Sequence, residues 1–218
     1  MGEVRGSHDE ITVDDIAERL YDIVRGSSSV DEMLYYNDIQ NRRLMLNTEI
    51  AQCTIAEAVS HIMRYNREDI GKPTEERKPI VLYVVSGGGE TLSGFELIDV
   101  IENSKTPVYT VNLGYWYSMA FVIGLAGHKR YSLKNATFLM HDGSSYMSAS
   151  SSKAQDQAEF LRRLDDRIRD YIISRSNLTY EEYASKERVE WYLFAEEAKE
   201  KGFIDYIIGV DCDMEEVL

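Results

Sequence analysis

Apolar runs alternate with stretches of helical periodicity through most of the chain. The clearest run, residues 79–85, is continuously apolar and lies between a polar loop and three glycines, which is typical of a strand buried on both faces. Shorter runs predict further strands, and apolar positions at three- and four-residue spacing predict helices between them. The predicted strands are 43–46, 79–85, 108–112, 130–133, 137–140 and 203–208, and the predicted helices are 12–25, a helix from Thr54, 92–103, 118–127 and 153–175.

Strands that alternate with helices indicate an α/β fold of right-handed β-α-β units around a largely parallel sheet. The first predicted helix is set apart, because the glycine and serine residues of 26–29 interrupt the pattern after it. The last eight residues are strongly acidic. We therefore expect an N-terminal helical extension at 1–30, one main domain at 31–210, and an acidic C-terminal tail at 211–218.

Composition narrows the classes of partner. The chain has 218 residues and a formal net charge of -14, from 38 acidic and 24 basic residues. This balance argues against nucleic acid or an anionic membrane as the main partner. The start lacks the pattern of a signal peptide, and no apolar run approaches the ~20 residues that span a bilayer.

Two isolated cysteines, Cys53 and Cys212, indicate neither a disulfide framework nor a zinc site. Together with the missing signal pattern, they fit a reducing compartment. We expect a cytoplasmic protein without a metal ion or cofactor.

The buried strand leads directly into a glycine turn, Ser86-Gly87-Gly88-Gly89. Glycines adopt backbone conformations that other residues avoid, so backbone N–H groups can point at a ligand here. The turn lacks the Gly-Lys-Ser/Thr of a phosphate loop and the spacing of a dinucleotide fingerprint. A tight strand-to-helix connection with no ligand is the ordinary alternative.

Ser118 is the second candidate. It stands between the aromatic triplet Tyr115-Trp116-Tyr117 and an apolar helix, so it is placed at or near a helix N-terminus. The helix dipole there favours developing negative charge. The ordinary alternative is that Ser118 is only a helix cap.

His141 follows the strand 137–140 and precedes Asp142 and Gly143. Ends of parallel strands converge at one edge of a sheet, so His141 can meet Ser118 although the two are distant in sequence. A buried, hydrogen-bonded structural histidine is the alternative. His8, His61 and His128 are weaker candidates, placed in the N-terminal extension, on the polar side of a helix and in a turn.

The order of a glycine turn, a serine at a helix start and a histidine at a strand end resembles the Clp proteolytic-subunit family. A fourth motif supports the resemblance: an acid precedes Leu193-Phe-Ala195-Glu-Glu-Ala198, and Gly202-Phe-Ile-Asp205 follows. The resemblance covers about residues 40 to 208. It implies the spiral Clp-protease/crotonase-like fold, with the 153–175 helix as a long handle.

Carried over residue by residue, the resemblance implies that Ser118 attacks the scissile carbonyl and His141 takes its proton. The N–H groups of Gly89 and Met119 would hold the oxyanion. Gly88 and the segment after the histidine, Asp142 and Gly143, would bind the substrate backbone in extended form.

The third triad member of the family is an aspartate, and the matching position holds Glu190. A glutamate can orient a histidine, but its additional methylene needs room. Glu187 and Asp142 are the other acids near in sequence, and a solvated surface charge or a ring contact is the alternative for Glu190. The bulky residues 115–117 stand where the family has small ones, which suggests a narrower substrate pocket.

The resemblance implies a serine endopeptidase that needs no cofactor and assembles as two stacked heptameric rings. A partner unfoldase of the AAA+ type would feed it unfolded polypeptide. Three alternatives stay open: a non-catalytic or weakly active ring subunit, a virus-type maturation peptidase of the same fold, and a crotonase-type enzyme that handles acyl-CoA. The last does not need a serine and a histidine at these positions.

Overall fold

The computed structural model describes residues 29–143 and 151–218. The predicted helix 12–25 and nearly all of the predicted extension therefore lie outside the described residues. The chain divides into two compact units, 1–41 and 42–218. In the first, α2 (Val30–Gln40) begins with a capping box, in which Ser29 and Glu32 each accept from the other's backbone N–H. The apolar pattern did not predict α2.

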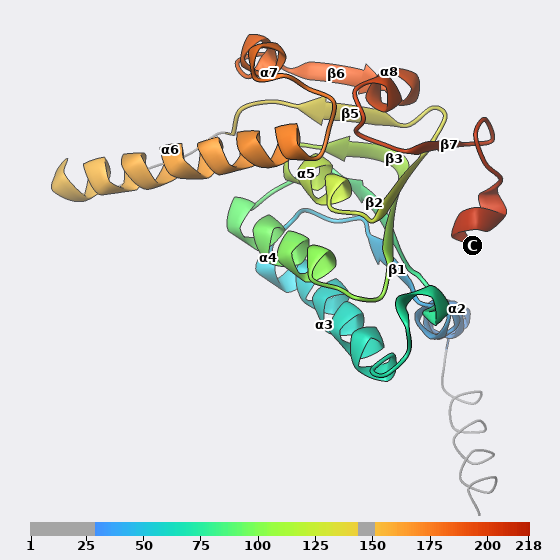
Figure 1. Cartoon of the computed structure of the whole chain (residues 1–218). Coiled ribbons are helices and arrows are strands. Elements are labelled where there is room, and N and C mark those ends of the chain that lie inside the picture. Colours follow the sequence, from blue (N-terminus) through green and yellow to red (C-terminus); the bar gives the residue numbers. More distant parts are fainter. Residues whose placement is uncertain (1–28, 144–150) are drawn as a thin grey trace, which may run out of the picture. The chain divides into compact units, whose positions relative to one another are not determined.

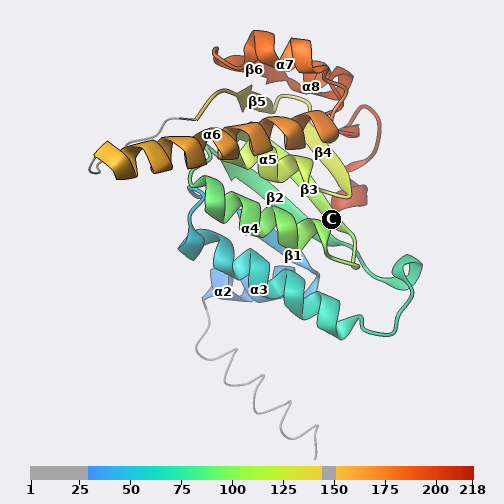
Figure 2. The ribbon, with the colours of Figure 1, turned by 60° about the vertical axis from the view of Figure 1, so that its left-hand side comes forward.

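The second unit is organised around a mostly parallel sheet (Figure 2). Its main order is β1-β2-β3-β4-β7, all parallel. The strand β5 pairs in parallel with the far end of β3, and β6 pairs antiparallel with β5. The strands are β1 (Arg43–Leu46), β2 (Ile80–Ser86), β3 (Val108–Tyr117), β4 (Lys129–Leu133), β5 (Thr137–Met140), β6 (Trp191–Phe194) and β7 (Tyr206–Ile208).

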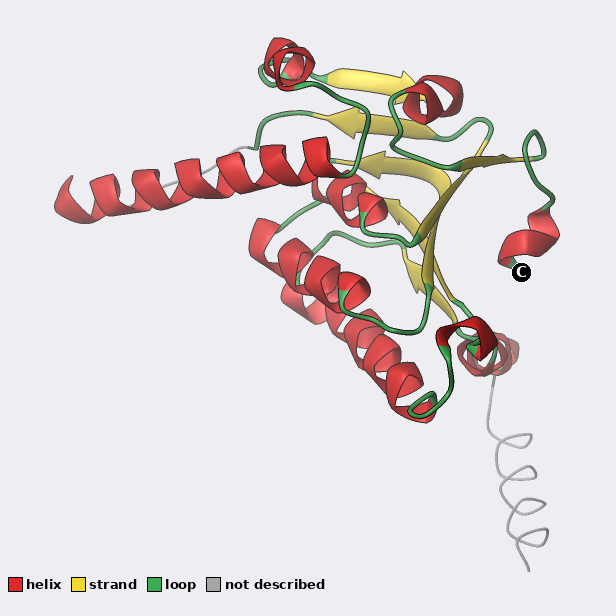
Figure 3. Ribbon diagram, viewed as in Figure 1, coloured by secondary structure: helices red, strands yellow, loops and turns green. Residues whose placement is uncertain are grey.

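Helices α3 (Gln52–Glu68), α4 (Thr91–Glu102) and α5 (Met119–Leu125) cover one side of this sheet (Figure 1). The long helix α6 (Ser151–Ser174) projects beyond the sheet edge (Figure 3). Short elements complete the unit: the 3-10 turn η1 (Thr74–Glu76), α7 (Tyr180–Lys186) and α8 (Ala195–Glu200). No helix in the described parts of the chain combines the length and apolar character needed to cross a membrane. The predicted α/β fold with a long helix is confirmed.

The strand β3 is longer than predicted, because it continues from Asn112 to Tyr117. Trp116 fixes the extension: it is fully buried, its indole N–H donates to the Val84 carbonyl, and its ring packs edge-on against Phe138. A Cβ on Gly124 would lie 2.3 Å from the Trp116 ring, so only glycine permits this approach of α5. α5 is the helix that follows Ser118, so its packing on β3 helps to fix the position of Ser118.

The predicted acidic tail is packed onto the sheet. Its 3-10 turn η2 (Met214–Val217) lies on the opposite side of the sheet from α3, α4 and α5 (Figure 1). Val217 is fully buried in a cluster with Val81, Val111, Tyr131 and Ile208. The Tyr83 hydroxyl also donates to the Val217 carbonyl. Although this segment is acidic, the buried side chain of Val217 holds it on the sheet.

A buried ion pair joins β1 to the end of α3. The Asp69 side chain has no exposed surface. It accepts two hydrogen bonds from the Arg42 guanidinium, of which the one from Nη2 is 2.9 Å long. It accepts a third, of 3.0 Å, from the Thr106 hydroxyl. Hydrogen bonding by Arg42 holds the pKa of Asp69 well below its ordinary value. Because the folded-state pKa is depressed, this carboxylate stabilises the fold above about pH 4 and loses that contribution as the pH falls.

We expect Asp69→Ala to lower the free energy of unfolding by about 3–5 kcal/mol at pH 7, since it removes the buried carboxylate that Arg42 bonds and leaves only the half-exposed Glu68, 3.5 Å from Nη2, as its counter-charge. Urea unfolding at pH 7 and pH 3 measures this, and the difference from the unchanged protein should shrink at pH 3. Glu159→Gln is the control, because Glu159 pairs with Arg162 on α6 and both side chains are exposed. Equal losses in the two variants would contradict the assignment.

Candidate active site

The glycine turn after β2 is held on one edge by Ile50. The Gly88 carbonyl accepts from the Ile50 N–H at 2.8 Å, and the Glu90 N–H donates to the Ile50 carbonyl at 2.7 Å. Gly89 has φ +148°, and a Cβ there would lie 2.2 Å from the Ile50 oxygen, so the position requires glycine. Within the described residues, no partner accepts a hydrogen bond from the Gly89 N–H.

Gly88 brings the turn against Ser118. Its φ is +97°, and a Cβ there would lie 2.7 Å from the Ser118 Cβ and 2.9 Å from the Met119 nitrogen. The Gly88 N–H donates to the Ser86 hydroxyl, and its carbonyl is engaged by Ile50. Both backbone groups of Gly88 thus have partners inside the fold, and the contribution that the structure shows for this residue is close approach to Ser118.

Ser118 occupies the single residue between β3 and α5. It has φ +52° and ψ -126°, a region that costs a non-glycine residue about 1–3 kcal/mol. Its N–H donates to the Leu139 carbonyl at 3.0 Å, which ties this strained residue to β5. The side chain makes no capping hydrogen bond to α5. Ser118 therefore occupies the N-cap position of α5, but its hydroxyl does not cap the helix.

Met119 is the first residue of α5. Its N–H has no acceptor within the helix, because the first N–H groups of a helix precede the first intrahelical bonds. It lies beside Gly88, as the 2.9 Å approach of a Gly88 Cβ to its nitrogen shows. The N–H groups of Gly89 and Met119 thus belong to adjoining segments on either side of Ser118.

Ser118 and His141 line one cleft of about 250 Å³. The glycine turn and α5 form one part of its wall, the end of β5 another, and α6 closes it with Ile168 and Ile172. No hydrogen bond joins the Ser118 hydroxyl to the His141 ring among the described residues. The complete lining is Gly87, Gly89, Thr91, Ser118, Met119, Phe121, Val122, Met140, His141, Gly143, Ile168 and Ile172.

Glu190 is placed elsewhere. It immediately precedes β6, is exposed to solvent, and does not line the cleft. Its carboxylate accepts a hydrogen bond of 3.0 Å from the Tyr192 hydroxyl, which raises the pKa of Tyr192. The structure therefore brings together Ser118, His141, Gly89, Met119 and Gly143, and leaves Glu190 outside this group.

Acidic side chains gather beyond His141. The pKa of Asp165 on α6 is raised by burial and then by the carboxylates of Glu187, Asp166 and Asp142. Asp142 is exposed and does not line the cleft. In the described parts of the chain, no three or more His, Cys, Asp or Glu side chains are gathered closely enough to hold a metal ion.

The aromatic triplet does not narrow the cleft. Trp116 is in the core, whereas Tyr115 and Tyr117 lie on the opposite side of β3, with ring centroids 5.0 Å apart. None of the three is among the residues that line the cleft. The prediction of a narrower pocket from this triplet is therefore wrong, because side chains alternate between the two faces of a strand.

The other described histidines have structural contacts. The His128 ring accepts a hydrogen bond of 3.1 Å from the Val108 N–H, and His61 stacks on Tyr65 with 5.9 Å between ring centroids. His8 lies outside the described residues. Among the described histidines, only His141 lines the cleft with Ser118.

Comparison with known proteins agrees with the architecture around this cleft. Residues 26–211 match the family model described as Clp protease. This chain belongs to the Clp protease family. It is accordingly a peptidase of the Clp proteolytic-subunit type.

Three Clp protease relatives show the extent of the similarity. The ATP-dependent Clp protease proteolytic subunit 2 of Treponema pallidum is 26% identical over 190 residues, covering 86% of this chain and 92% of the relative. The proteolytic subunit of Dehalococcoides mccartyi is 28% identical over 186 residues, covering 84% and 89%. Proteolytic subunit 1 of Frankia casuarinae is 29% identical over 188 residues, covering 84% of each chain.

The sequence does not predict a role for three residues at or near the Clp-type site. Ile168 and Ile172 of the long helix close the cleft. Tyr192 lies outside the cleft, and its hydroxyl donates to Glu190. The four-residue spacing of the isoleucines was a usable signal for one helix face, whereas the tyrosine contact had no counterpart in the sequence pattern.

Proposed function

We propose that this chain is a serine endopeptidase in which Ser118 is the nucleophile and His141 is its general base. The observation that carries the proposal is the strained backbone of Ser118, without a capping role, in one cleft with His141. Ser118 attacks the scissile carbonyl carbon, and His141 takes the hydroxyl proton and returns it to the leaving amine. Strain of this kind persists where the surrounding structure fixes a residue for its chemistry.

The N–H groups of Gly89 and Met119 stabilise the oxyanion in this mechanism. Each lacks a partner on the protein side in the described residues, and the two segments that carry them adjoin Ser118. One such donor contributes about 10²–10³-fold to turnover in comparable hydrolases. No metal ion or organic cofactor takes part in any step.

We place the substrate backbone, in extended form, along the cleft between the glycine turn and the segment of Asp142 and Gly143. Gly143 lines the cleft, which supports its part in this role. The role of Gly88 differs from our expectation: it lacks a side chain, which lets the glycine turn lie close to Ser118. Glu190 is our candidate for the acid that orients His141, on the strength of its match to the family's aspartate.

A fluorophosphonate probe tests the proposal, since it forms a covalent bond with an activated serine. We expect stoichiometric labelling of the assembled protein at Ser118, located by peptide mapping, and none in Ser118→Ala. Ser185→Ala is a matched control, because Ser185 lies on α7 and donates only to the Glu182 carbonyl. A folded, assembled protein that is not labelled would refute the proposal.

We also propose that the chain assembles into heptameric rings stacked in pairs and receives unfolded polypeptide from an AAA+ unfoldase. Membership of the Clp protease family supports a ring with an ATPase partner, and the projecting α6 supports contacts between rings. Neither nucleic acid nor a membrane is a partner in this proposal. We place the protein in the cytoplasm, where the free thiols of Cys53 and Cys212 would stay reduced.

A second candidate function is a ring subunit with little or no catalytic activity. The position of Glu190 favours it, because a histidine without its orienting acid is a weaker base. The probe separates the two, since this subunit would assemble without being labelled.

A further inference from the structure

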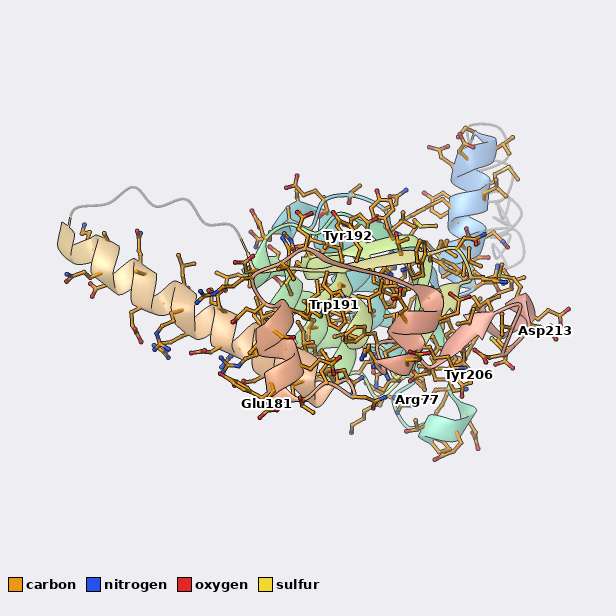
Figure 4. All side chains as sticks on the ribbon, turned by 90° about the horizontal axis from the view of Figure 1, so that it is seen from above. Arg77, Glu181, Trp191, Tyr192, Tyr206 and Asp213 are labelled. Carbon is orange, nitrogen blue, oxygen red and sulfur yellow. The ribbon has the colours of Figure 1, made fainter. Side chains whose placement is uncertain are left out.

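Glu190 and Tyr192 form a local pair at the start of β6. Glu190 immediately precedes β6, and Tyr192 is the second residue of the strand. Their hydrogen bond of 3.0 Å places both side chains on one side of the chain, and Trp191 between them points to the other side. Figure 4 labels Trp191 and Tyr192. Trp191 packs edge-on against Phe203, with 6.1 Å between ring centroids. The pair of Glu190 and Tyr192 is therefore on the face of β6 that is turned away from this contact.

The Tyr192 ring is itself held in place. It packs edge-on against Tyr117 at 5.9 Å between centroids, and the Tyr117 hydroxyl lies 3.0 Å from the Thr137 hydroxyl across β3 and β5. Tyr192 is 54% exposed, so its ring is anchored on one side and open to solvent on the other. A fixed phenol next to a carboxylate sets the direction of that carboxylate better than a mobile side chain would.

Two backbone connections link this pair to Ser118. Tyr117, which contacts the Tyr192 ring, immediately precedes Ser118 in the chain. Leu139 is paired with both Tyr117 and Tyr192, and its carbonyl accepts a hydrogen bond from the Ser118 N–H. Yet neither Glu190 nor Tyr192 lines the cleft. The carboxylate at the family's acid position is thus near the strands that carry the nucleophile and is engaged by a different donor.

We propose that Tyr192 is a positioning residue that withholds Glu190 from His141, so that the triad is complete only when the hydrogen bond between Tyr192 and Glu190 opens. This inference rests on the proposed serine peptidase function. A hydroxyl and the imidazole N–H compete for the same carboxylate. Removing the hydroxyl removes one competitor and increases the population with Glu190 at the histidine.

Tyr192→Phe is the direct test, because it deletes the hydroxyl and keeps the ring that packs on Tyr117. Hydrogen bonds at exposed sites have small net effects, so we expect the maximal rate of fluorophosphonate labelling at Ser118 to rise about 3–10-fold. The probe concentration at half-maximal rate should not change. A rise in rate at unchanged probe affinity is not expected from a merely structural change.

Two further variants make the test specific. In a Glu190→Gln background, Tyr192→Phe should no longer raise the rate, because the carboxylate that it would release is gone. Tyr171→Phe is the matched control: the Tyr171 hydroxyl donates to Glu102 at 2.9 Å, so it loses the same kind of bond away from β6. Its labelling rate should match the unchanged protein.

The possible results are distinct. If Ser118 is labelled and Tyr192→Phe leaves or lowers the rate, the inference is wrong and the peptidase stands. If the gain persists in the Glu190→Gln background, the hydroxyl does not act through the carboxylate, and the inference is again wrong. If neither the unchanged protein nor any variant is labelled, the proposed function fails and this inference with it.

Discussion

Ser118→Ala is expected to lower hydrolysis of an unfolded polypeptide about 10⁶-fold, because the attacking oxygen is removed while the fold is retained. The measurement is the release of fluorescent peptide from a labelled, unfolded protein by the purified protein. Ser185→Ala should retain full activity. Residual hydrolysis of more than a few per cent by Ser118→Ala would assign the nucleophile elsewhere.

A companion variant separates chemistry from backbone strain. Ser118 has φ +52°, which alanine tolerates no better than serine but glycine tolerates readily. Ser118→Gly should therefore be as inactive as Ser118→Ala and more stable, by about 1 kcal/mol after the greater chain entropy of glycine is subtracted. Thermal unfolding of the two variants measures this. A less stable glycine variant would mean that the backbone at Ser118 is relaxed.

The sheet could largely be predicted from the sequence. The strand 137–140 was predicted at its observed bounds, and the buried strand was displaced by one residue, from 79–85 to 80–86. These segments are apolar because they are covered on both faces, and that burial leaves a continuous pattern. Helices α4 and α6 could be predicted because apolar residues recur at helical spacing along one side of each.

Elements that depend on a distant partner were missed. The strand β6 pairs antiparallel with β5, and its four residues, Trp191 to Phe194, are a short aromatic and apolar run that we assigned only to the family motif. The end of β3 was missed because Gly114 looked like a break, whereas pairing of Tyr115 to Tyr117 with β5 continues the strand. Helix α2 is almost wholly exposed, so it lacks the apolar stripe by which helices are recognised.

The candidate site shows the same division between what is local and what is not. The order of the glycine turn, Ser118 and His141 follows from where strands end, so their meeting in one cleft could be expected. The left-handed backbone of Ser118 could not, because its neighbours Tyr117 and Met119 give no sign of a sharp turn. The contact between Tyr192 and Glu190 depends on side-chain direction at a strand that had not been predicted.

Several acids compete for the role of third triad member. Glu190 matches the family's aspartate but contacts Tyr192. Burial, and then the nearby charges of Glu187, Asp166 and Asp142, raise the pKa of Asp165. Such mutual repulsion makes the group costly in the absence of a cation. A protonated His141 formed during acylation would be attractive to any carboxylate within reach.

Glu190→Ala discriminates among these acids. We expect kcat/KM for a fluorogenic peptide to fall about 10²–10⁴-fold, because His141 loses the group that fixes its orientation and stabilises its cation. The loss is larger than the gain from Tyr192→Phe, since the latter changes only how often the carboxylate is available. Glu190→Asp keeps a carboxylate and should retain more activity than the alanine variant.

The controls are Glu187→Gln and Asp142→Asn, each of which removes one charge from the neighbouring group of acids. We expect both to stay within a few-fold of the unchanged protein, because neither residue stands at the position of the family's aspartate and the proposed role of Asp142 in substrate binding uses its backbone. If one of them loses 10²-fold or more and Glu190→Ala is near normal, that residue is the orienting acid and the match of Glu190 to the family's aspartate is not functional. If all three variants are near normal, His141 works without an acid from this set. Glu190 would then remain bonded to the Tyr192 hydroxyl during the reaction.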